Sequence, residues 1–588
     1  RKQGPQQGPI DWSEFIKQAQ QSGAGADFNK IKSRFSHLKK RTIIIAAVVL
    51  VLVLALAYWW FHPAINIQSI DLWGFLVVIL ALVTFVLFVF RQIYQTGMGK
   101  REKSPKKVKL FSGLMAIPIA IAVIGAVGWL ASQSFFPGNA EKYSTVLVTE
   151  DADFATDIPE VYYSEIPFID KDCAILLGNR TMCTMADYVS QFEISDLYSQ
   201  INYKGQPVRV SPLNYADFFK WWANKDGGIP AYVIVNMSTQ DTEIVRLENP
   251  IRYSDSDPFF YNVDRHVQLS YPFYMFDEKS FEINDDGEPF WIYPVQKRTI
   301  GLFGGTTIQR VVLCNASTGE CQDFAIEDVP QWVDRAYPAE LLIEQYNWSG
   351  ALSGGWINSW LGQNGVKQTT PSTDGKSGFN YIAQDDDVWV YSGVTSATAD
   401  NSIIGCVMIN QRTAESKFYS VAGATEESAM RSAEGQVQHL KDDATFPLLI
   451  NVDGQPTYFM ALKDAAGLVK MYAMVDIQRY QNVAVGDTLA ATEKSYKQLL
   501  VSQGINVGGS DASAHPSAGS TSGTIASISP VVLDGNSHYY LILDGQQAIF
   551  DCPVASVVDV VRYKVGDVIV LNHGSSEGNV VLVDSIGE

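Results

Sequence analysis

The chain has 588 residues, of which 47 % are hydrophobic, and its formal net charge is −19 at pH 7. The charge is unevenly distributed, because residues 1–136 hold sixteen Lys and Arg against five Asp and Glu, whereas residues 137–588 hold 28 against 58. A basic head followed by an acidic body excludes a description of the chain as one uniform soluble domain.

Three long apolar runs lie in the basic head, at residues 42–60, 70–90 and 111–136. At about 1.5 Å per residue, each run is long enough to cross a roughly 30 Å hydrocarbon layer as a helix. A core helix of a soluble protein would show a polar face, and these runs show none. We therefore expect three transmembrane helices within residues 42–136.

The positions of the cations predict the orientation of these helices. Lys and Arg precede the first run and fill the loop 91–110 between the second and third, whereas residues 63–69 carry no charge. By the positive-inside tendency, the segment 1–41 and the loop 91–110 are cytoplasmic, and the chain from residue 137 onward is extracytoplasmic. We expect a multi-pass protein of the cytoplasmic membrane, with the first run as an uncleaved anchor. The span centres carry no ionisable residue, which argues against a transporter or proton channel.

The extracytoplasmic part divides at a stretch rich in Gly, Ser and Ala. Residues 504–523 cannot bury a core and are expected to form a flexible linker. A large block, 137–503, precedes the linker, and a small block, 524–588, follows it. The length of the large block suits more than one domain.

The large block contains an internal repeat, in which an apolar strand is followed by Asn-x-x-Thr-x-acid and a second strand. The repeated turn positions are Asn236 and Thr239, then Asn315, Thr318 and Gly319, then Asn410 and Thr413. Asn and Thr side chains bond to their own turn backbone, so each copy predicts a β-hairpin. Apparent helices at 212–225, 340–346 and 426–440 separate the hairpins. The fold class is therefore α+β, with repeated units of a helix plus an antiparallel sheet.

The cysteines predict two disulfides. Cys314 and Cys321 flank the second turn on opposite strands, where cross-strand Cβ atoms lie about 4.5–5.5 Å apart. Cys173 and Cys183 form a second local pair, and Cys406 and Cys552 are expected to stay buried and free. A Cys-x6-Cys spacing with no convergent His argues against a zinc site.

The helix-then-meander order resembles the extracytoplasmic PepSY family, whose repeats carry an Asp-x-x-Thr-Gly-Glu-like turn. The likeness covers about residues 230–480, and the copy from Asn315 to Glu320 keeps the Thr-Gly-Glu triplet, with Asn where the family often has Asp. The resemblance implies an envelope module, of a kind thought to modulate secreted peptidases. It supplies no catalytic residues.

The small block, 524–588, contains five short apolar segments separated by Asp-Gly and Gly-Asp turns. This pattern predicts a small closed β-barrel that resembles an OB-fold. Arg562 and Lys564 are the only cations in the block. Because a phosphate backbone needs a cationic groove, we expect no nucleic-acid partner.

The chain shows no recognisable catalytic motif. His-Glu-x-x-His is absent, and we assign none of the seven histidines to a nucleophile in a recognisable motif such as Gly-x-Ser-x-Gly. We therefore expect no enzyme and name no catalytic residue.

Three acidic clusters would suit extracellular calcium, but none follows the EF-hand pattern and acidic turns are ordinarily solvated, so no cofactor or metal site is predicted. They are Asp151, Asp153 and Asp157, then Asp285 and Asp286, then 385–387.

One segment is a candidate binding surface. Residues 347–365 combine glycines with Trp348, Trp356 and Trp360, which is typical of a loop displayed for a partner.

The sequence favours a membrane-anchored bacterial envelope protein whose non-enzymatic ectodomain binds envelope proteins or copies of itself. The PepSY resemblance implies the alternative, a regulator or chaperone of secreted peptidases. An envelope hydrolase lacks motif support.

Overall fold

The structure is a computed structural model. It describes residues 40–96, 105–158, 166–185, 187–371, 378–384, 386–396, 402–503, 519–533, 536–546, 548–554, 557–573 and 580–587. The N-terminal segment 1–39 and the middle of the basic loop, which we expected to be cytoplasmic, lie outside these ranges.

Three long helices occupy the basic head: α3 (Lys40–Phe61), α4 (Ile70–Thr96) and α5 (Pro105–Ala131). Two of them contain a stretch long and apolar enough to cross a membrane, at Ile70–Val89 and Val108–Ala131, and 0 % and 6 % of those windows are buried. Such exposure is not that of core helices in a soluble domain. In α3, the apolar stretch among the described residues is Val51–Phe61, which is shorter. Two of the three expected spans are therefore present as helices long and apolar enough to cross a membrane.

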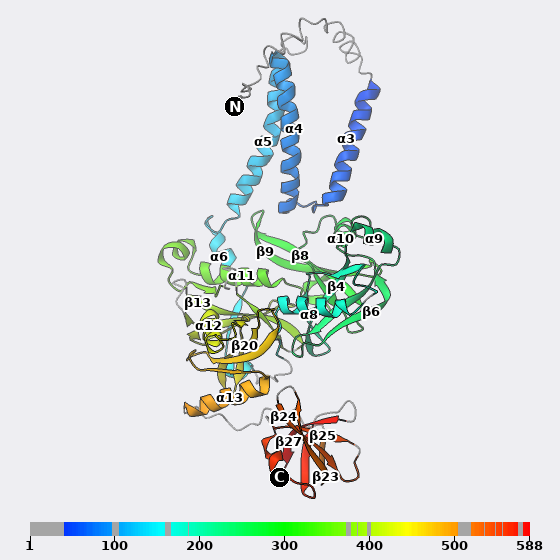
Figure 1. Ribbon diagram of the computed structural model, residues 1–588. Helices are drawn as coiled ribbons and strands as arrows, with labels where there is room; N and C mark the ends of the chain where they lie inside the picture. The colour runs from blue at the N-terminus through cyan, green and yellow to red at the C-terminus, as the bar shows by residue number, and fades with distance from the viewer. Residues whose placement is uncertain are drawn as a thin grey trace, which may run out of the picture. The chain divides into compact units, whose positions relative to one another are not determined.

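Small residues of α5 allow close contacts with neighbouring segments. A Cβ atom added to Gly125 would meet the Trp73 ring of α4 at 2.7 Å, and one added to Gly128 would meet the side chain of Leu302 at 2.3 Å. The described residues up to Pro63, with α3, belong to one unit, and the described chain from Ala64 belongs to another. Contacts of α4 and α5 with the sheets therefore lie within one unit (Figure 1).

Two antiparallel sheets occupy residues 192–325. The first has the order β2-β4-β5-β6, with β3 paired to β4, and the second has the order β10-β9-β8-β7. The strands of the first are β2 (Phe192–Ile194), β3 (Ser199–Tyr203), β4 (Gln206–Tyr215), β5 (Ile229–Asn236) and β6 (Thr242–Ile251). Those of the second are β7 (Ser280–Ile283), β8 (Pro289–Ile300), β9 (Gly304–Asn315) and β10 (Cys321–Ala325).

Two further sheets follow. One has the order β1-β16-β15-β13-β11, with β12 paired to β13, and the other has the order β18-β20-β21-β22, with β19 paired to β20. The first contains β1 (Thr149–Ala152), β11 (Lys367–Thr369), β12 (Asn380–Gln384), β13 (Asp387–Ser396), β15 (Gly405–Asn410) and β16 (Ser416–Tyr419). The second contains β18 (Asp443–Ala444), β19 (Leu448–Val452), β20 (Gln455–Lys463), β21 (Val469–Asp476) and β22 (Val483–Gly486). The short strands β14 (Ser402–Ile403) and β17 (Gly423–Ala424) pair with each other.

Helices lie between the sheets in sequence. They are α6 (Asn139–Ser144), α7 (Phe154–Asp157), α8 (Lys171–Cys183), α9 (Phe218–Asn224), α10 (Val263–Ser270), α11 (Ala339–Leu352), α12 (Glu426–Gln436) and α13 (Leu489–Ser502). Helices are present where we expected them near 340–346 and 426–440. The expected helix at 212–225 is wrong for residues 212–215, which belong to β4. Asp217 caps α9 through hydrogen bonds from the Phe219 and Lys220 N–H groups, so the helix begins only at Phe218.

The four sheets share their interior. One apolar cluster draws buried side chains from Phe154 through Leu500, and a second joins Leu147 to strands β8, β9, β13 and β15. Because residues far apart in the sequence fill the same core, residues 137–503 form a packed mixed α+β body, as the helix and hairpin pattern predicted.

The C-terminal strands pair in a closed ring, β23-β24-β25-β27-β26. They are β23 (Gly519–Leu533), β24 (Asn536–Leu543), β25 (Ile549–Pro553), β26 (Val568–His573) and β27 (Val580–Gly587), and they enclose a separate core. Residues 519–523 were expected to belong to the linker, but they pair with β26 as the first part of β23. The linker prediction is wrong for these residues, and 504–518 lie outside the described ranges.

The repeated Asn-x-x-Thr pattern closes three hairpins with one turn geometry. In each copy, the Asn Oδ1 atom accepts hydrogen bonds from the N–H groups two and three residues onward, and the Asn N–H donates to the carbonyl of the acidic residue. Gln240, Gly319 and Ala414 hold the left-handed position, with φ of 68°, 76° and 60°. The residues flanking each turn are register partners: Val235 with Thr242, Cys314 with Cys321, and Ile409 with Ser416.

A buried carboxylate joins α12 to β13. Glu426 is 1 % exposed, and its Oε1 atom accepts hydrogen bonds from the Gly393 N–H at 2.7 Å and the Tyr391 hydroxyl at 3.2 Å. Burial raises the pKa of Glu426 above its ordinary value of 4.5.

We predict that Glu426→Gln changes the pH dependence of stability. In the folded protein this carboxyl holds its proton more tightly than in the unfolded chain, so its contribution is largest at low pH and falls as pH rises through the raised pKa. Gln keeps an oxygen acceptor but cannot ionise. The melting temperature of the variant minus that of the wild type should therefore increase as pH rises above about 4.5. A difference that stays flat between pH 4 and 8 would contradict the expectation.

Candidate functional site

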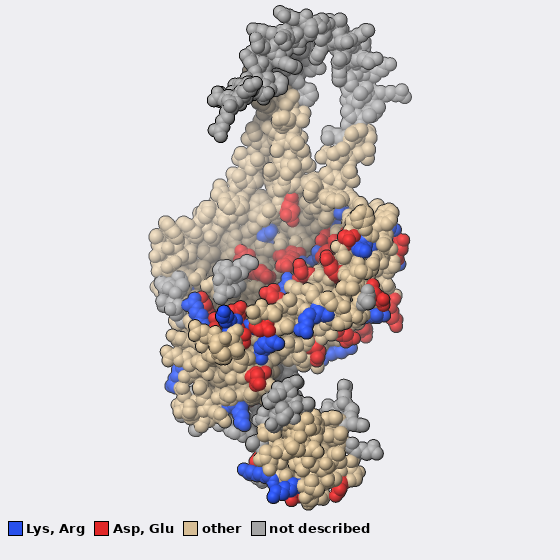
Figure 2. All heavy atoms as spheres, viewed as in Figure 1, with Lys and Arg blue, Asp and Glu red and all other residues tan. Residues whose placement is uncertain are grey.

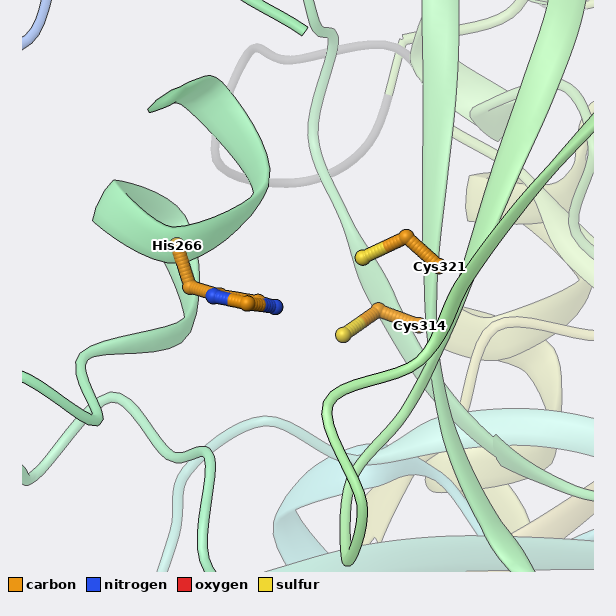
Figure 3. Close-up of side chains that lie close together, drawn as sticks. All are labelled: His266, Cys314 and Cys321. Atoms are coloured by element: carbon orange, nitrogen blue, oxygen red, sulfur yellow. The ribbon is translucent and has the colours of Figure 1, made fainter. Parts of the chain in front are cut away.

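Two cysteines and a histidine come together beside the second repeated turn. Cys314 is the penultimate residue of β9 and Cys321 begins β10, and the two are direct register partners. His266, on α10, points its ring toward both sulfurs (Figure 3). The two sulfurs and a ring nitrogen of His266 all lie within 4.8 Å of one another. Cys314 is buried, and the other two side chains are half-buried.

The turn and α10 hold this arrangement in place. Asn262 caps α10 by accepting a hydrogen bond from the Arg265 N–H, which fixes the first turn of the helix that carries His266. The His266 Nε2 atom lies 2.8 Å from the Gly319 carbonyl oxygen. The Tyr253 ring covers the imidazole, with 4.3 Å between ring centroids. A Cβ atom at Gly319 would meet the Tyr253 ring at 2.3 Å, so a glycine is needed there for space as well as for its φ of 76°.

The contacts shift the pKa values of the two thiols in opposite directions. A hydrogen bond from Cys314, aided by one from His266, lowers the pKa of Cys321 to about 6. The same Cys314–Cys321 bond, together with burial, raises the pKa of Cys314. The bond to Cys321 raises the pKa of His266. The contacts therefore favour the thiolate form of Cys321 beside a thiol donor and an imidazole, a set that suits nucleophilic, redox or metal-ligand chemistry.

The structure does not support the predicted disulfides, since all six cysteines are free. Cys314 and Cys321 lie opposite each other, as expected from the turn, but without a bond between their sulfurs. Cys173 and Cys183 stand at opposite ends of α8, the first buried and the second exposed. Ten helical residues span about 15 Å, so this pair is too far apart to bond. Cys406 and Cys552 are buried and free.

Sequence reasoning missed His266. We argued against a metal site at Cys314 and Cys321 because no His converges on them, and the structure places one there. His266 precedes Cys314 by 48 residues and lies on another element. No local spacing signals this approach, because it depends on α10 packing beside the β9–β10 turn.

The tryptophan-rich segment is mostly helical rather than a loop. Its first residues end α11, and 358–362 form the short π-helix η3 (Asn358–Gly362). Trp348 packs edge-on against Tyr143, with ring centroids 4.9 Å apart. Trp356 and Trp360 stack on each other at 6.1 Å and are exposed, and Trp356 also contacts Phe135. Two of the three candidate binding residues are therefore on the surface, and the third is packed.

The acidic clusters do not gather into a cation site among the described residues. Asp153 caps α7, Asp285 and Asp286 are exposed in a turn, and Asp387 pairs with Arg412. Residue 385 lies outside the described ranges. Within the part of the chain that the structure covers, His266, Cys314 and Cys321 are the only group of three or more His, Cys, Asp or Glu side chains with converging ligand atoms.

Comparisons with known proteins give no family for the chain. No protein-family model matches it, and no curated protein matches it. Among solved structures, a levansucrase mutant of B. megaterium is similar at 10 % identity, over 76 % of this chain and 97 % of that one, with a TM-score of 0.17. A likeness of that size supports no statement about fold or activity.

We predict that Gly319→Ala destabilises the protein and disturbs the cluster. A left-handed alanine costs about 1–2 kcal/mol, and the contact with Tyr253 adds an overpacking cost of about 1–3 kcal/mol. Gly205→Ala is the matched control, because Gly205 has a φ of 77° with nothing within 4 Å of the added Cβ. Thermal unfolding should show the larger loss for Gly319→Ala. Equal losses would show that Tyr253 does not constrain the turn.

Proposed function

We propose that the protein is a membrane-anchored cell-envelope protein whose non-enzymatic extracytoplasmic body binds other envelope proteins or copies of itself. The proposal takes α3, α4 and α5 as spans, with the N-terminus in the cytoplasm and the sheets and the OB-like barrel outside. The charge asymmetry of the chain supports that orientation.

The observation that carries the proposal is the direct attachment of the two apolar helices to the sheets. Ser132, one residue after α5, accepts a hydrogen bond from the Tyr143 hydroxyl at 2.7 Å and another from the Phe303 N–H at 3.0 Å. Before α4, the Ile65 N–H donates to the Pro272 carbonyl at 2.7 Å. On the face drawn in Figure 2, charged side chains gather over the sheets, while the visible surface of the helices is almost free of them. A body fixed in this way to exposed apolar helices is suited to presentation at a membrane surface.

A second function rests on the repeated hairpins. If the PepSY resemblance reflects kinship, the body regulates or chaperones secreted peptidases rather than assembling with itself. The three turns that share one hydrogen-bond pattern favour a repeated module, which both functions accommodate. An envelope hydrolase has the least support, because the described residues bring together no recognised catalytic motif.

The orientation can be tested with the exposed native thiol of Cys183. A membrane-impermeant maleimide added to intact cells should modify the wild-type peptide that contains Cys183, as read by mass spectrometry, and that adduct should be missing in Cys183→Ser. A cysteine introduced by Lys106→Cys in the Cys183→Ser background should react only after the cells are lysed. Labelling of Lys106→Cys but not of Cys183 on intact cells would reverse the proposed topology.

The binding role can be tested by crosslinking on intact cells followed by mass spectrometry of the linked peptides. We expect links between copies of this chain or to other envelope proteins. Links to a secreted peptidase would favour the regulatory alternative. Turnover of a substrate by the purified protein, abolished by one point substitution, would contradict a non-enzymatic role.

A further inference from the structure

We infer that His266, Cys314 and Cys321 form a binding site for a thiophilic d10 cation, zinc(II) or copper(I). The site goes beyond the proposed function and depends on the geometry of three side chains from three elements, α10, β9 and β10. Thiolate and imidazole ligands are the set that selects these ions over calcium or magnesium.

The distances suit a single ion. Zinc binds sulfur at about 2.3 Å and imidazole nitrogen at about 2.0 Å, so ligand atoms around it lie roughly 3.5–3.8 Å apart. The three ligand atoms here already lie within 4.8 Å of one another without a bound ion. A shift of about 1 Å or less would complete the geometry, and a cation would replace the Gly319 carbonyl as the partner of Nε2.

The surroundings also suit a bound ion. The hairpin fixes the two sulfurs as register partners, and the Tyr253 ring limits the freedom of the imidazole. Three protein ligands leave one position of a tetrahedral ion open to water or to a partner's side chain. In the other two hairpins, Val235 with Thr242 and Ile409 with Ser416 occupy the cysteine positions, so this repeat alone carries the ligand set.

The test uses the full chain in detergent, with thiols reduced, metal removed and oxygen excluded. Titration with cobalt(II) should give a thiolate-to-cobalt charge-transfer absorption that saturates at one ion per chain and disappears when zinc(II) is added. A parallel arm measures copper(I) binding against a chromophoric chelator. Together, the two arms identify which ion binds more tightly.

The variants Cys314→Ser, Cys321→Ser and His266→Ala should each weaken cobalt binding at least tenfold, whereas Cys183→Ser should leave it unchanged. Because a variant may fold poorly, X-ray absorption of the wild-type complex provides a second readout and should show two sulfur ligands and an imidazole. Absence of the absorption in a protein whose thiols are titratable would overturn the inference. So would isolation of the protein from cells with Cys314 and Cys321 joined in a disulfide.

A separate observation concerns exposed aromatic and aliphatic side chains at the end of the body that holds α4 and α5. We propose that this aromatic face lies in the lipid headgroup region of the outer leaflet. We define the face as Phe218, Phe219, Trp222, Phe260, Phe273, Trp356, Ile357, Trp360 and Leu361, all exposed. This inference rests on the proposed membrane anchorage.

Contacts connect the face to the ends of the spans. The Asn66 side chain donates to the Phe273 carbonyl at 3.2 Å, four residues before α4 begins. Trp356 meets Phe135, four residues after α5 ends, with ring centroids 6.0 Å apart. In Figure 1, α9 and α10 lie at the end of the sheets from which α4 and α5 leave. The face therefore begins where the hydrocarbon spans end.

The chemistry of the face matches the membrane interface rather than water. Phe219 and Phe260 are 79 % and 80 % exposed, and Trp222 and Trp360 are 63 % and 68 % exposed. Large apolar side chains at such exposure mark contact surfaces, and aromatic rings concentrate at the headgroup level of membranes. A cavity of about 250 Å³ beside Phe273 is also lined by the exposed Lys297, a cationic group that suits lipid phosphates.

The face can be tested in the full chain reconstituted into phosphatidylglycerol-containing nanodiscs. The photocrosslinker p-benzoylphenylalanine replaces Phe219, Phe273 or Trp360, and mass spectrometry detects lipid adducts. We expect adducts at all three positions. Val501 on α13, at 59 % exposure, is the matched surface control and should give none.

A fourth position separates this inference from the anchorage on which it rests. Leu82, in the middle of α4, is 61 % exposed and should form lipid adducts if the helix spans the bilayer. Adducts at Leu82 without adducts at the face would contradict lipid contact of the face and leave the membrane anchorage standing. Crosslinks from the face to a second copy of the chain would show that the face mediates self-association instead of lipid contact. Absence of adducts at Leu82 would overturn the anchorage itself.

Discussion

The hydrogen bonds of Ser132 attach the end of α5 to the β-sheet body. Its hydroxyl donates to the Gly128 carbonyl inside α5 and accepts from the Phe303 N–H in the β8–β9 turn, while its carbonyl accepts from Tyr143. One 1 % exposed serine thus joins a helix, a hairpin and the chain that leads into the body. Buried hydrogen bonds of this kind are costly to break, so the hairpin and the helix end should behave as one rigid element.

The three hairpin turns share one hydrogen-bond geometry, but only the second turn carries side chains that can act as metal ligands. All three depend on an Asn side chain that satisfies two backbone N–H groups and on one left-handed residue. At Gly319 the left-handed position also faces the Tyr253 ring, which leaves no room for a Cβ atom. Only the second copy places cysteines at its flanking positions. The turn fixes the spacing of those positions, so a change of side chains is enough to create a ligand pair.

Local signals in the sequence predicted the hairpins and much of the helix content, because turn chemistry and apolar strands act over a few residues. The expectation failed at 212–225, where the apolar residues of β4 run directly into the capped helix α9 and read as one segment. It also failed for Cys173 and Cys183, because a pairing drawn from sequence distance ignores the length of α8. His266 could not be foreseen, since its approach to the sulfurs is set by packing between separate elements.

The placement of β1 has a consequence for biogenesis. This strand follows α5 and α6 closely, yet it pairs in parallel with β16, where Thr149 faces Ser416. If the body crosses the membrane from its N-terminal end, β1 emerges long before its partner and stays unpaired until residues near 419 have been exported. Such non-local pairing is slow, and an unpaired strand edge invites aggregation. Under the proposed topology, the sheet would be completed only late in export, and a chaperone that shields β1 until then would have a defined task.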